Sequence, residues 1–322
     1  MKKRSLPLGI DIGSTRVRVA LAQWREDGPY VAGVAVREIT DGSASSGGIA
    51  EPAYVGALIE EAIQELGTRE RRCVCAIGEP DALMRTITLP KMSGSERERA
   101  ARFEAQRHID FPIEEATVRL RPVGEDVGTY ALGIVRSSVL TSRQQAVKAG
   151  RLRAVAIDHD ACALARLLPG CDAAIDVGHR RTSVHLYGSV TPRTVQIYCG
   201  GADITRSIER ELSIDERSAE KRKRILGTAG AGERHRSRLV ADIASSIDSA
   251  YERRKRPERI ALVGNGARLL GLAAEIEAAT GAIVDRNPGC AMHGAYPDDV
   301  VRASSPDWSL AVGLALWNVA VC

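Results

Sequence analysis

Two short segments of the chain place an aspartate two residues before a glycine, at the end of an apolar run. In the first segment Asp11 precedes Gly13, and in the second Asp176 precedes Gly178. A carboxylate beside a tight glycine turn lets backbone N–H groups approach a phosphate while the acid holds a cation. Because Mg²⁺ keeps most of its waters, Asp11 and Asp176 together can hold one hydrated ion. Either segment alone is also compatible with an ordinary β-turn.

The two segments open a longer internal repeat. Short runs of Val, Ile and Ala predict strands over 8–12, 17–24 and 30–36, a helix over 53–66 and a strand over 73–77. The same order returns in predicted strands over 173–177, 182–186 and 190–198, followed by a helix from about 202 to 212. Since the two aspartates lie about half a chain length apart, the pattern predicts two related lobes that face each other across a cleft. Loops are expected over 41–48 and 227–232, where small residues gather.

A third segment, Gly264 to Ala267, follows an apolar run as a glycine-rich turn before a predicted helix. Glycines there let a planar base and sugar lie against the backbone, and a helix N-terminus adds partial positive charge. Leu269 occupies the position of the third glycine in a GxGxxG fingerprint, which disfavours a Rossmann dehydrogenase. The sequence contains no GxxxxGK[ST] string, which excludes a P-loop enzyme at the level of motifs.

The order and spacing of these segments resemble the actin-like ATPase superfamily. The resemblance implies an α/β, ribonuclease H-like fold with two lobes around a cleft that binds ATP and Mg²⁺. Gly13, Ser14 and Thr15 are expected to cradle the β- and γ-phosphates, with Mg²⁺ held by Asp11 and Asp176 through water. The predicted nucleotide-binding residues are Asp11, Gly13, Ser14, Thr15, Asp176, Gly178, Thr182, Gly200, Gly201, Glu220, Lys223, Gly264, Asn265, Gly266 and Ala267. Because no water-positioning group is identified, ATP hydrolysis is expected to be slow or absent.

Within that superfamily the chain is similar to the PilM family of type IV pilus assembly proteins and, more distantly, to FtsA. Four segments carry this resemblance: EAQRHIDFPIEE at 104–115, AGRL at 149–152, GGADITRSI at 200–208 with AEKRK at 219–223, and SLAVGLAL at 309–316. The resemblance implies a first lobe with subdomain 1A over 1–89, 157–170 and 307–322. It also implies an inserted subdomain 1C over 90–156, which begins with a charged helix over 95–108, and a second lobe over 171–306 with subdomain 2B at about 202–258.

The PilM resemblance also implies a function. Such a protein is a cytoplasmic ATP-binding scaffold, peripheral to the inner membrane, that grips the N-terminal cytoplasmic tail of the single-pass membrane protein PilN in a groove between 1A and 1C. Glu220 and Lys223 would lie against the ribose and adenine, opposite the turn at 264–267. Other pilus motor or platform proteins and a second copy of the chain are further candidate partners.

Three other functions stay open at this point. They are a small-molecule kinase of the same superfamily, a filament-forming FtsA-like protein, and a counterpart in a type II secretion or competence system. The sequence ends directly after its last predicted helix, which is unfavourable for an FtsA-like amphipathic anchor or a GspL-like transmembrane helix.

Composition excludes several other classes. The 45 Lys and Arg exceed the 41 Asp and Glu by a net charge of only +4, so nucleic acid is not expected as a partner. Seven Cys without a CxxC pair argue against a disulfide scaffold and a zinc module, and Cys73 and Cys75 are expected as buried apolar residues. The most apolar stretch, 308–322, is shorter than the ~20 residues that span a bilayer.

Several residues allow two interpretations. His179, Arg180 and Arg181 fill the second phosphate turn, where they either supply positive charge to the γ-phosphate or crowd it. Phe103 and Phe111 are the only Phe residues, and they are expected in the core of the insertion, with partner contact as the alternative. The basic runs at 220–224 and 251–256 favour a solvated helix face, with attraction of anionic lipid or nucleic acid as the alternative.

Overall fold

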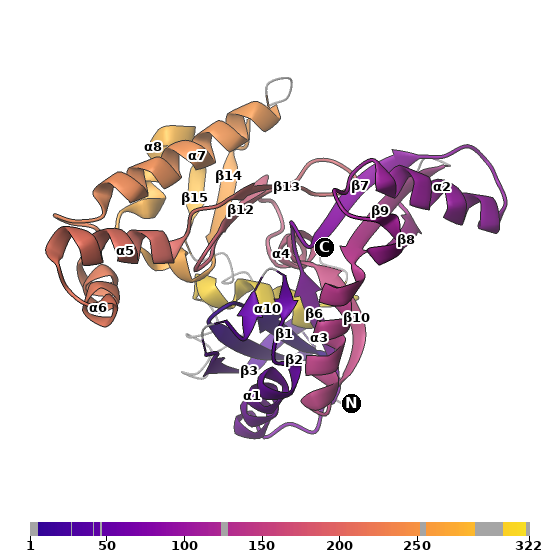
Figure 1. Cartoon of the computed structure of the whole chain (residues 1–322), viewed down its shortest axis with the longest axis horizontal. Helices are drawn as coiled ribbons and strands as arrows, with labels where there is room; N and C mark the ends of the chain where they lie inside the picture. The colour runs from indigo at the N-terminus through magenta and orange to yellow at the C-terminus, as the bar shows by residue number, and fades with distance from the viewer. Residues whose placement is uncertain are drawn as a thin grey trace.

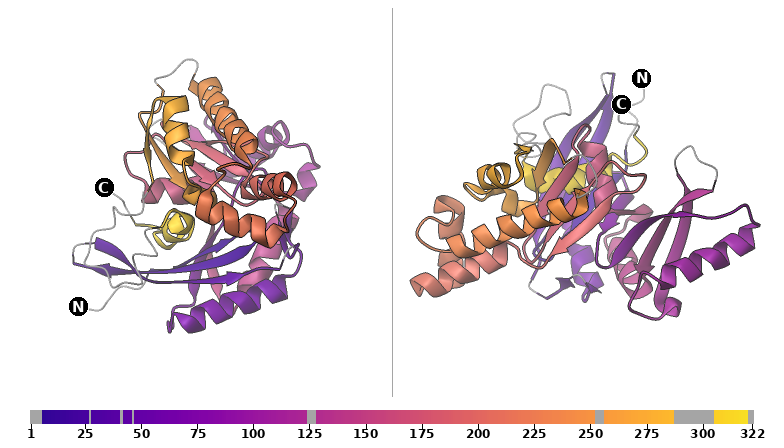
Figure 2. Two further views of the ribbon diagram at one scale, coloured as in Figure 1. Left: turned by 90° about the vertical axis from the view of Figure 1, so that its left-hand side faces the viewer. Right: turned by 90° about the horizontal axis from the view of Figure 1, so that it is seen from above.

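The computed structural model describes residues 6–26, 28–40, 42–45, 47–123, 128–251, 256–286 and 305–319. Two five-stranded sheets form the centres of two lobes, and a smaller three-stranded sheet projects from the first lobe (Figure 1). The second lobe and the small sheet lie on opposite sides above the first-lobe sheet in this view. Seen from above, the small sheet and its helix project outward at the right of the view (Figure 2).

The first-lobe sheet has the strand order β10-β6-β1-β2-β3. Its strands are β1 (Leu8–Ile12), β2 (Arg16–Arg25), β3 (Gly28–Glu38), β6 (Arg72–Ile77) and β10 (Arg153–His159). Helices α1 (Pro52–Glu65) and α3 (Ser137–Ala149) cover one face, while α4 (Asp160–Leu167) and α10 (Ser309–Ala315) cover the other. Because both faces are buried, β1 is almost continuously apolar, and β2 is buried from Val17 to Ala22.

The second-lobe sheet repeats this arrangement. Its order is β13-β12-β11-β14-β15, built from β11 (Ala173–Val177), β12 (Thr182–Leu186), β13 (Arg193–Ile197), β14 (Arg259–Val263) and β15 (Ile283–Asp285). Strand β11 pairs antiparallel with β12 and parallel with β14, just as β1 pairs with β2 and β6. The predicted repeat is therefore confirmed. The strand expected over 190–198 begins only at Arg193, because Gly188 has a positive φ of 93° and Pro192 has no N–H to donate.

Four helices of the described residues belong to the second lobe. Helices α7 (Glu233–Tyr251) and α8 (Leu272–Thr280) pack on the sheet, and α5 (Gly201–Leu212) and α6 (Glu216–Leu226) pack on each other at its outer end (Figure 1). The turn at 227–232 joins α6 to α7 as predicted, but Thr228 and Ala231 within it are buried. The loop expected over 41–48 contains two short paired strands, β4 (Ala44–Ser45) and β5 (Gly48–Ile49), while residues 41 and 46 lie outside the described part.

The inserted unit differs in its bounds from the predicted 90–156. Its sheet, in the order β7-β9-β8, is built from β7 (Ala82–Thr88), β8 (Ala116–Pro122) and β9 (Thr129–Arg136), with helix α2 (Gly94–Gln106) and the 3₁₀ turn η1 (Ile113–Glu115). Strand β7 lies before residue 90. In contrast, β10 is a strand of the first-lobe sheet, and α3 packs on that sheet. The Pro90-to-Gly94 signal marks the start of α2, where Ser93 and Glu96 form a capping box, and not the start of the unit.

The C-terminal helix α10 returns to the first lobe, as predicted, and lies between β1 and α4. Glycines make both contacts possible. A Cβ on Gly9 of β1 would lie 1.9 Å from the Ala311 carbonyl oxygen, and a Cβ on Gly313 would lie 2.2 Å from that of Ala163. Just before α10, the Pro306 carbonyl accepts a hydrogen bond of 2.9 Å from the Gly264 N–H. The C-terminal segment thus ties the first lobe to the second.

Gly313→Ala is expected to destabilise the fold although alanine is the better helix former. The new methyl group has no room beside Ala163, and we expect the free energy of unfolding to fall by about 2 kcal/mol in urea denaturation. Gly94→Ala is the matched control, because nothing lies within 4 Å of its Cβ position at the start of α2. Equal stability of the two variants would contradict this packing.

Two smaller observations concern the cysteines and the membrane. Cys73 and Cys75 are buried and free in β6, as predicted, and burial raises the pKa of both thiols, that of Cys75 to about 11. Among the described residues, no helix combines the length and the apolar character that crossing a bilayer requires.

Candidate functional site

Two adjoining cavities lie where the lobes meet. The larger, of about 300 Å³, lies on the second lobe between α6 and the 3₁₀ turn η2 (Asn265–Arg268). The smaller, of about 130 Å³, lies between the β1–β2 turn and the β11–β12 turn. Both cavities are lined by Arg16, Gly178, His179 and Asn265, so they form one cleft.

The smaller cavity brings the two predicted phosphate turns together. Asp11, Gly13, Ser14 and Thr15 line it from the first lobe, opposite Asp176, Gly178 and Gly264 from the second. The two turns have the same hydrogen bond, from the Gly13 N–H to the Arg16 carbonyl and from the Gly178 N–H to the Arg181 carbonyl, each of 2.9 Å. The repeat read from the sequence is therefore a repeat of turn geometry, and it places both carboxylates on one small cavity.

Negative charge is concentrated in this cavity. Burial, together with the charges of Asp11 and Asp160, raises the pKa of Asp176 to about 7. Burial also raises the pKa of Asp11, although Arg18 and Arg143 oppose the shift. The Arg18 guanidinium lies 3.5 Å from an Asp11 oxygen and 3.6 Å from an Asp307 oxygen. The Arg18 guanidinium therefore balances the negative charge of Asp11 and Asp307 only in part, and the carboxylates of the cavity still favour binding of a further cation.

The cavity fits Mg²⁺ as a hydrated ion. The oxygen donors Asp11 and Asp176 suit a hard cation. Within the described residues, no group of three His, Cys, Asp or Glu side chains is placed to hold a metal directly. The two carboxylates would therefore hold Mg²⁺ mainly through its own waters.

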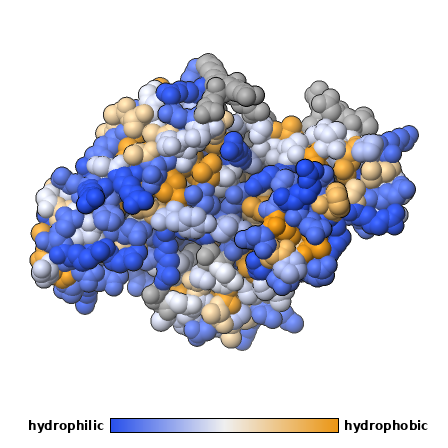
Figure 3. All heavy atoms as spheres, turned by 45° about the horizontal axis from the view of Figure 1, so that its top comes forward, coloured by the Kyte–Doolittle hydropathy of each residue, from blue (hydrophilic) through white to orange (hydrophobic). Residues whose placement is uncertain are grey.

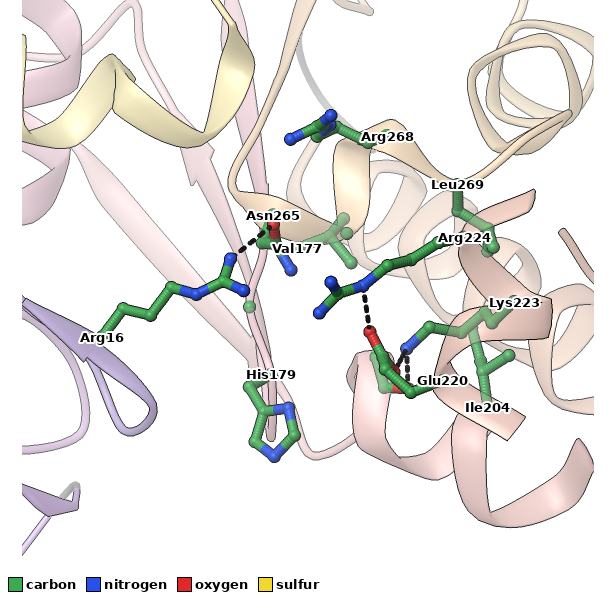
Figure 4. Close-up of a pocket in the computed structure, with 13 residues that line it drawn as sticks. Arg16, Val177, His179, Ile204, Glu220, Lys223, Arg224, Asn265, Arg268 and Leu269 are labelled. Atoms are coloured by element: carbon green, nitrogen blue, oxygen red, sulfur yellow. Dashed lines mark hydrogen bonds and ion pairs between the residues drawn. The ribbon is translucent and has the colours of Figure 1, made fainter. Parts of the chain in front are cut away.

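The larger cavity carries an ordered polar cluster on α6, drawn in Figure 4. The Lys223 Nζ lies 2.6 Å from Glu220 and donates hydrogen bonds to the Gly201 carbonyl at 2.9 Å and to the Thr205 hydroxyl at 2.7 Å. Burial alone would raise the pKa of Glu220, but Lys223, Thr205 and Arg224 lower it to about 2. Burial lowers the pKa of Lys223. The two side chains form an ion pair and face the turn at Asn265 and Gly266 across the cavity.

The glycines of that turn are required by its contact with β11. Gly264 has φ +83°, and a Cβ there would lie 2.1 Å from an Asp176 oxygen. A Cβ on Gly266 would lie 2.3 Å from Val177 Cγ1. From the sequence, these glycines are predicted to let a base and sugar approach the backbone. The structure shows that they first allow the turn to lie against β11.

Three predicted residues do not line either cavity. Thr182 is fully buried and donates a hydrogen bond of 2.9 Å to the Cys199 carbonyl, so it joins β12 to the end of β13. Gly200 lets the start of α5 approach the second turn, because a Cβ there would lie 2.6 Å from the His179 carbonyl oxygen. Ala267 packs against the second-lobe core. That these three residues contact nucleotide stays a prediction, and the structure gives each of them a packing role.

The structure adds residues that sequence reasoning missed, above all Arg16. Its guanidinium crosses the cleft toward the Asn265 side-chain oxygen, 3.5 Å away, and lies between the two cavities (Figure 4). Arg16 and Arg18 alternate with buried Val17 and Val19 along β2. That alternation was a usable signal, because it places both guanidinium groups on the side of the strand opposite the core valines. Asp307 gave no such signal, because tertiary packing alone brings it to the cleft.

The unusual second turn supplies positive charge to the cleft. His179 lines both cavities, and its ring lies at the cavity in Figure 4. Arg181 is turned inward, and its charge opposes the rise that burial causes in the pKa of Asp81 and of Asp176. Arg180 is exposed. Of the two sequence interpretations, the electrostatic one agrees with this geometry.

A separate groove of about 910 Å³ lies between the inserted sheet and the first lobe. One face of the sheet forms its wall, with Met84, Gly133 and Arg119 side by side on neighbouring strands. Ile157 and Cys162 close the side of the first lobe. Apolar groups dominate the lining, and Figure 3 shows apolar surface gathered right of centre, toward the inserted unit.

The second lobe also reaches this groove. Val190, Thr191 and Pro192 complete its rim, and the Thr191 hydroxyl forms a hydrogen bond of 2.8 Å with the Thr86 hydroxyl of β7. The groove expected between two subdomains is thus bordered by three parts of the chain.

The two Phe residues of the inserted unit have different environments. Phe111 packs against the core of the unit, and the Arg136 guanidinium lies 3.8 Å from its ring centre. Phe103 is 68% exposed on the outer side of α2, so the prediction that it belongs to the core is wrong. On α2 the buried positions are Ala101 and Ala105, and residue 103 falls on the opposite face of the helix.

Comparison with known proteins decides the family. The family model for "Type IV pilus assembly protein PilM" matches residues 9–319. This chain belongs to the PilM family. The predicted membership is confirmed over almost the whole length. No curated protein sequence matched the chain.

Solved structures agree with this assignment. A chain of a PilM-PilN type IV pilus biogenesis complex is 26% identical, with a TM-score of 0.84 over 96% of this chain and 97% of that one. The ethanolamine utilization protein EutJ from Carboxydothermus hydrogenoformans is 15% identical, with a TM-score of 0.59 over 96% and 89% of the two chains. A nucleotide-free diol dehydratase-reactivating factor is 11% identical, with a TM-score of 0.58 over 97% and 99%. The last two show the fold alone, and the predicted actin-like ATPase fold is confirmed.

Proposed function

We propose that this chain is an ATP-binding scaffold of type IV pilus assembly that captures the N-terminal segment of a PilN-like protein in the groove beside the inserted sheet. The observation that carries the proposal is the likeness to a chain of a PilM-PilN complex over 96% of this chain. That likeness includes the inserted unit, which supplies one wall of the groove. The groove and the nucleotide cleft are separate, so one chain would hold both ligands at once.

In this proposal the cleft binds ATP with its adenosine in the larger cavity and its phosphates in the smaller one. Glu220 and Lys223 would face the ribose and adenine across from Asn265 and Gly266. The N–H groups of the Gly13 turn and the Arg16 guanidinium would contact the phosphates. Asp11 and Asp176 would hold Mg²⁺, which supplies positive charge to the phosphate oxygens when it is bound. ATP then acts as a ligand that favours the closed lobes.

The groove would take its partner on a sheet face. Its wall is formed by residues of β8 and β9, such as Thr117 and Arg119 on one strand and Ala131 and Gly133 on the next. This favours insertion of apolar side chains between the sheet and the first lobe over addition of a strand to a sheet edge. The Thr191 hydroxyl of the second lobe is hydrogen-bonded to the Thr86 hydroxyl of β7. Closure of the lobes would therefore change the width of the groove.

Calorimetric titration of the purified chain tests this function. We expect one-site binding of Mg-ATP and one-site binding of a synthetic PilN-like N-terminal segment, with a segment affinity that changes when ATP is present. Binding of ATP without any binding of the segment would favour the small-molecule kinase instead. Failure to bind ATP would leave the actin-like fold without its nucleotide.

Arg16→Gln is expected to weaken ATP binding by about ten-fold and to leave adenosine binding unchanged. The side chain lies between the two cavities, where it would meet phosphate and not base. Titration with ATP, ADP and adenosine measures the difference. Arg25→Gln is the matched control on the same strand, because Arg25 packs on Tyr30 at 3.7 Å, away from the cleft. An equal loss for ATP and adenosine would show that Arg16 only supports the cleft structurally.

A further inference from the structure

Helix α6 carries an exposed face that the nucleotide cleft does not use. Glu220 and Lys223 point toward the cleft, whereas Arg217, Lys221 and Ile225 follow one another at intervals of four residues on the opposite side. All three are exposed, and α6 lies at the outer end of the second lobe (Figure 1). Within the described part of the chain, the Arg217 and Lys221 side chains take part in no ion pair.

Apolar side chains lie at the C-terminal end of α6, next to this exposed face. Ile225 is 60% exposed, Leu226 is 52% exposed and Leu270 is 56% exposed. Leu270 lies beside the C-terminal end of α6, because a Cβ on Gly227 would be only 3.1 Å from the Leu270 Cβ. Large aliphatic side chains that gather on an otherwise hydrophilic surface mark an interaction site more often than isolated ones do. Figure 3 shows that the end of the molecule formed by α5 and α6 is mainly hydrophilic, with apolar residues among the polar ones.

The acidic residues nearby reduce the charge of this face only in part. Glu220 is already paired with Lys223 and Arg224, at 2.6 and 2.9 Å. Glu216 is the exposed acid of the first turn. Since α6 contains five basic and two acidic residues, its outer face keeps a positive balance.

We propose that Arg217, Lys221, Ile225, Leu226 and Leu270, here called the α6 patch, bind the surface of an anionic phospholipid bilayer. Cations along one side of a helix, with aliphatic side chains at one end, match a surface that offers phosphate charge above an apolar layer. Lys and Arg reach headgroup phosphates with long side chains while neighbouring aliphatic groups enter the layer. The exposed charges and aliphatic groups lie at the outer end of the second lobe, where an extended surface such as a bilayer can reach them (Figure 1). This inference depends neither on ATP nor on the PilN-like segment.

Co-sedimentation of the full chain with vesicles tests the proposal. The probes are vesicles of equal parts phosphatidylglycerol and phosphatidylcholine and vesicles of phosphatidylcholine alone. We expect binding to the anionic vesicles that weakens as salt is raised, and none to the neutral ones. The double variant Arg217→Glu with Lys221→Glu should bind at least about ten-fold more weakly. The double variant Ile225→Ser with Leu226→Ser should also bind anionic vesicles more weakly. The binding that remains should still weaken as salt is raised.

The matched control is Arg99→Glu with Lys148→Glu, which reverses two exposed charges on α2 and α3, far from α6 (Figure 1). It should bind as the unmodified chain does. Equal binding of the α6 variants and the unmodified chain would overturn the proposal, as would no binding of the unmodified chain to anionic vesicles. The unmodified chain could also sediment without vesicles, and the α6 variants could abolish that sedimentation. This result would overturn the proposal and would indicate that the α6 patch binds a second copy of the chain. Thermal unfolding of each variant shows that the fold is retained.

Discussion

Gly133→Trp is expected to weaken binding of a PilN-like N-terminal segment by about a hundred-fold and to leave ATP affinity unchanged. Gly133 lies in the middle of β9, on the face that forms the wall of the groove. The nearest atom to its Cβ position is the Arg119 carbonyl oxygen at 3.9 Å, so the fold has room for a side chain there. An indole would occupy the space that the partner requires. Fluorescence anisotropy with a labelled segment measures the loss.

Gly94→Trp is the control for this substitution. It adds the same side chain to the same inserted unit, at a position where nothing lies within 4 Å of the Cβ. We expect it to bind the segment normally. If Gly133→Trp binds as tightly as the unmodified chain, the partner does not use this groove. If both variants lose binding equally, the inserted unit is affected as a whole.

Asp176→Asn is expected to have opposite effects on stability and on ligand binding. Asp176 lies in one cavity with Asp11, and burial with neighbouring acids raises its pKa from 3.8 to about 7. Because the raised pKa favours the protonated form in the fold, the contribution of this group to stability falls as pH rises from about 4 to about 7. The neutral amide avoids this cost. Without metal or nucleotide, the free energy of unfolding should rise by about 2 kcal/mol at about pH 8, a value reduced because Asp176 is partly exposed.

The same substitution removes one of the two carboxylates proposed to hold Mg²⁺. Affinity for Mg-ATP should fall by about a hundred-fold, since a charged ligand to the hydrated cation is lost. Urea denaturation at several pH values and calorimetry with Mg-ATP measure the two effects. Asp248→Asn, an exposed acid of α7 paired with Arg256 at 2.8 Å, should change neither quantity beyond a few tenths of a kcal/mol. A less stable Asp176→Asn protein with unchanged Mg-ATP affinity would contradict the assignment of the cleft.

Much of the fold could be predicted because local pattern and tertiary environment agree. The strands around Asp11 and Asp176 are short apolar runs that end in glycine turns, and both lie in the middle of a sheet covered on two faces. The internal repeat then predicts that the turn after Asp11 and the turn after Asp176 face each other. The hydrogen bond of Thr182 to the Cys199 carbonyl could not be predicted in this way, because alternation along a strand does not say which hydroxyl bonds to a neighbouring carbonyl.

The rest depended on contacts between distant segments. Arg16 and Asn265 meet across the cleft although 249 residues separate them, and Asp307 reaches Arg18 only because α10 packs on β1. The inserted unit was displaced in the prediction because Pro90 and Gly94 are strong helix-start signals. The pattern of β7 does not show which sheet it joins. Phe103 is a similar case. An aromatic side chain favours burial, and only the position of residue 103 on the outer face of α2 makes it exposed.

The central claim is that one chain holds nucleotide and partner at two separate sites. Amide hydrogen exchange of the chain with Mg-ATP, with a PilN-like segment and with both tests it most directly. We predict that Mg-ATP protects the turn at 13–16, the turn at 264–268 and the start of α5. The segment should protect β8 and the rim at 190–192, and the two together should protect both sets. No protection of β8 and the rim by the segment, or no protection of the turns at 13–16 and 264–268 by Mg-ATP, would contradict the account.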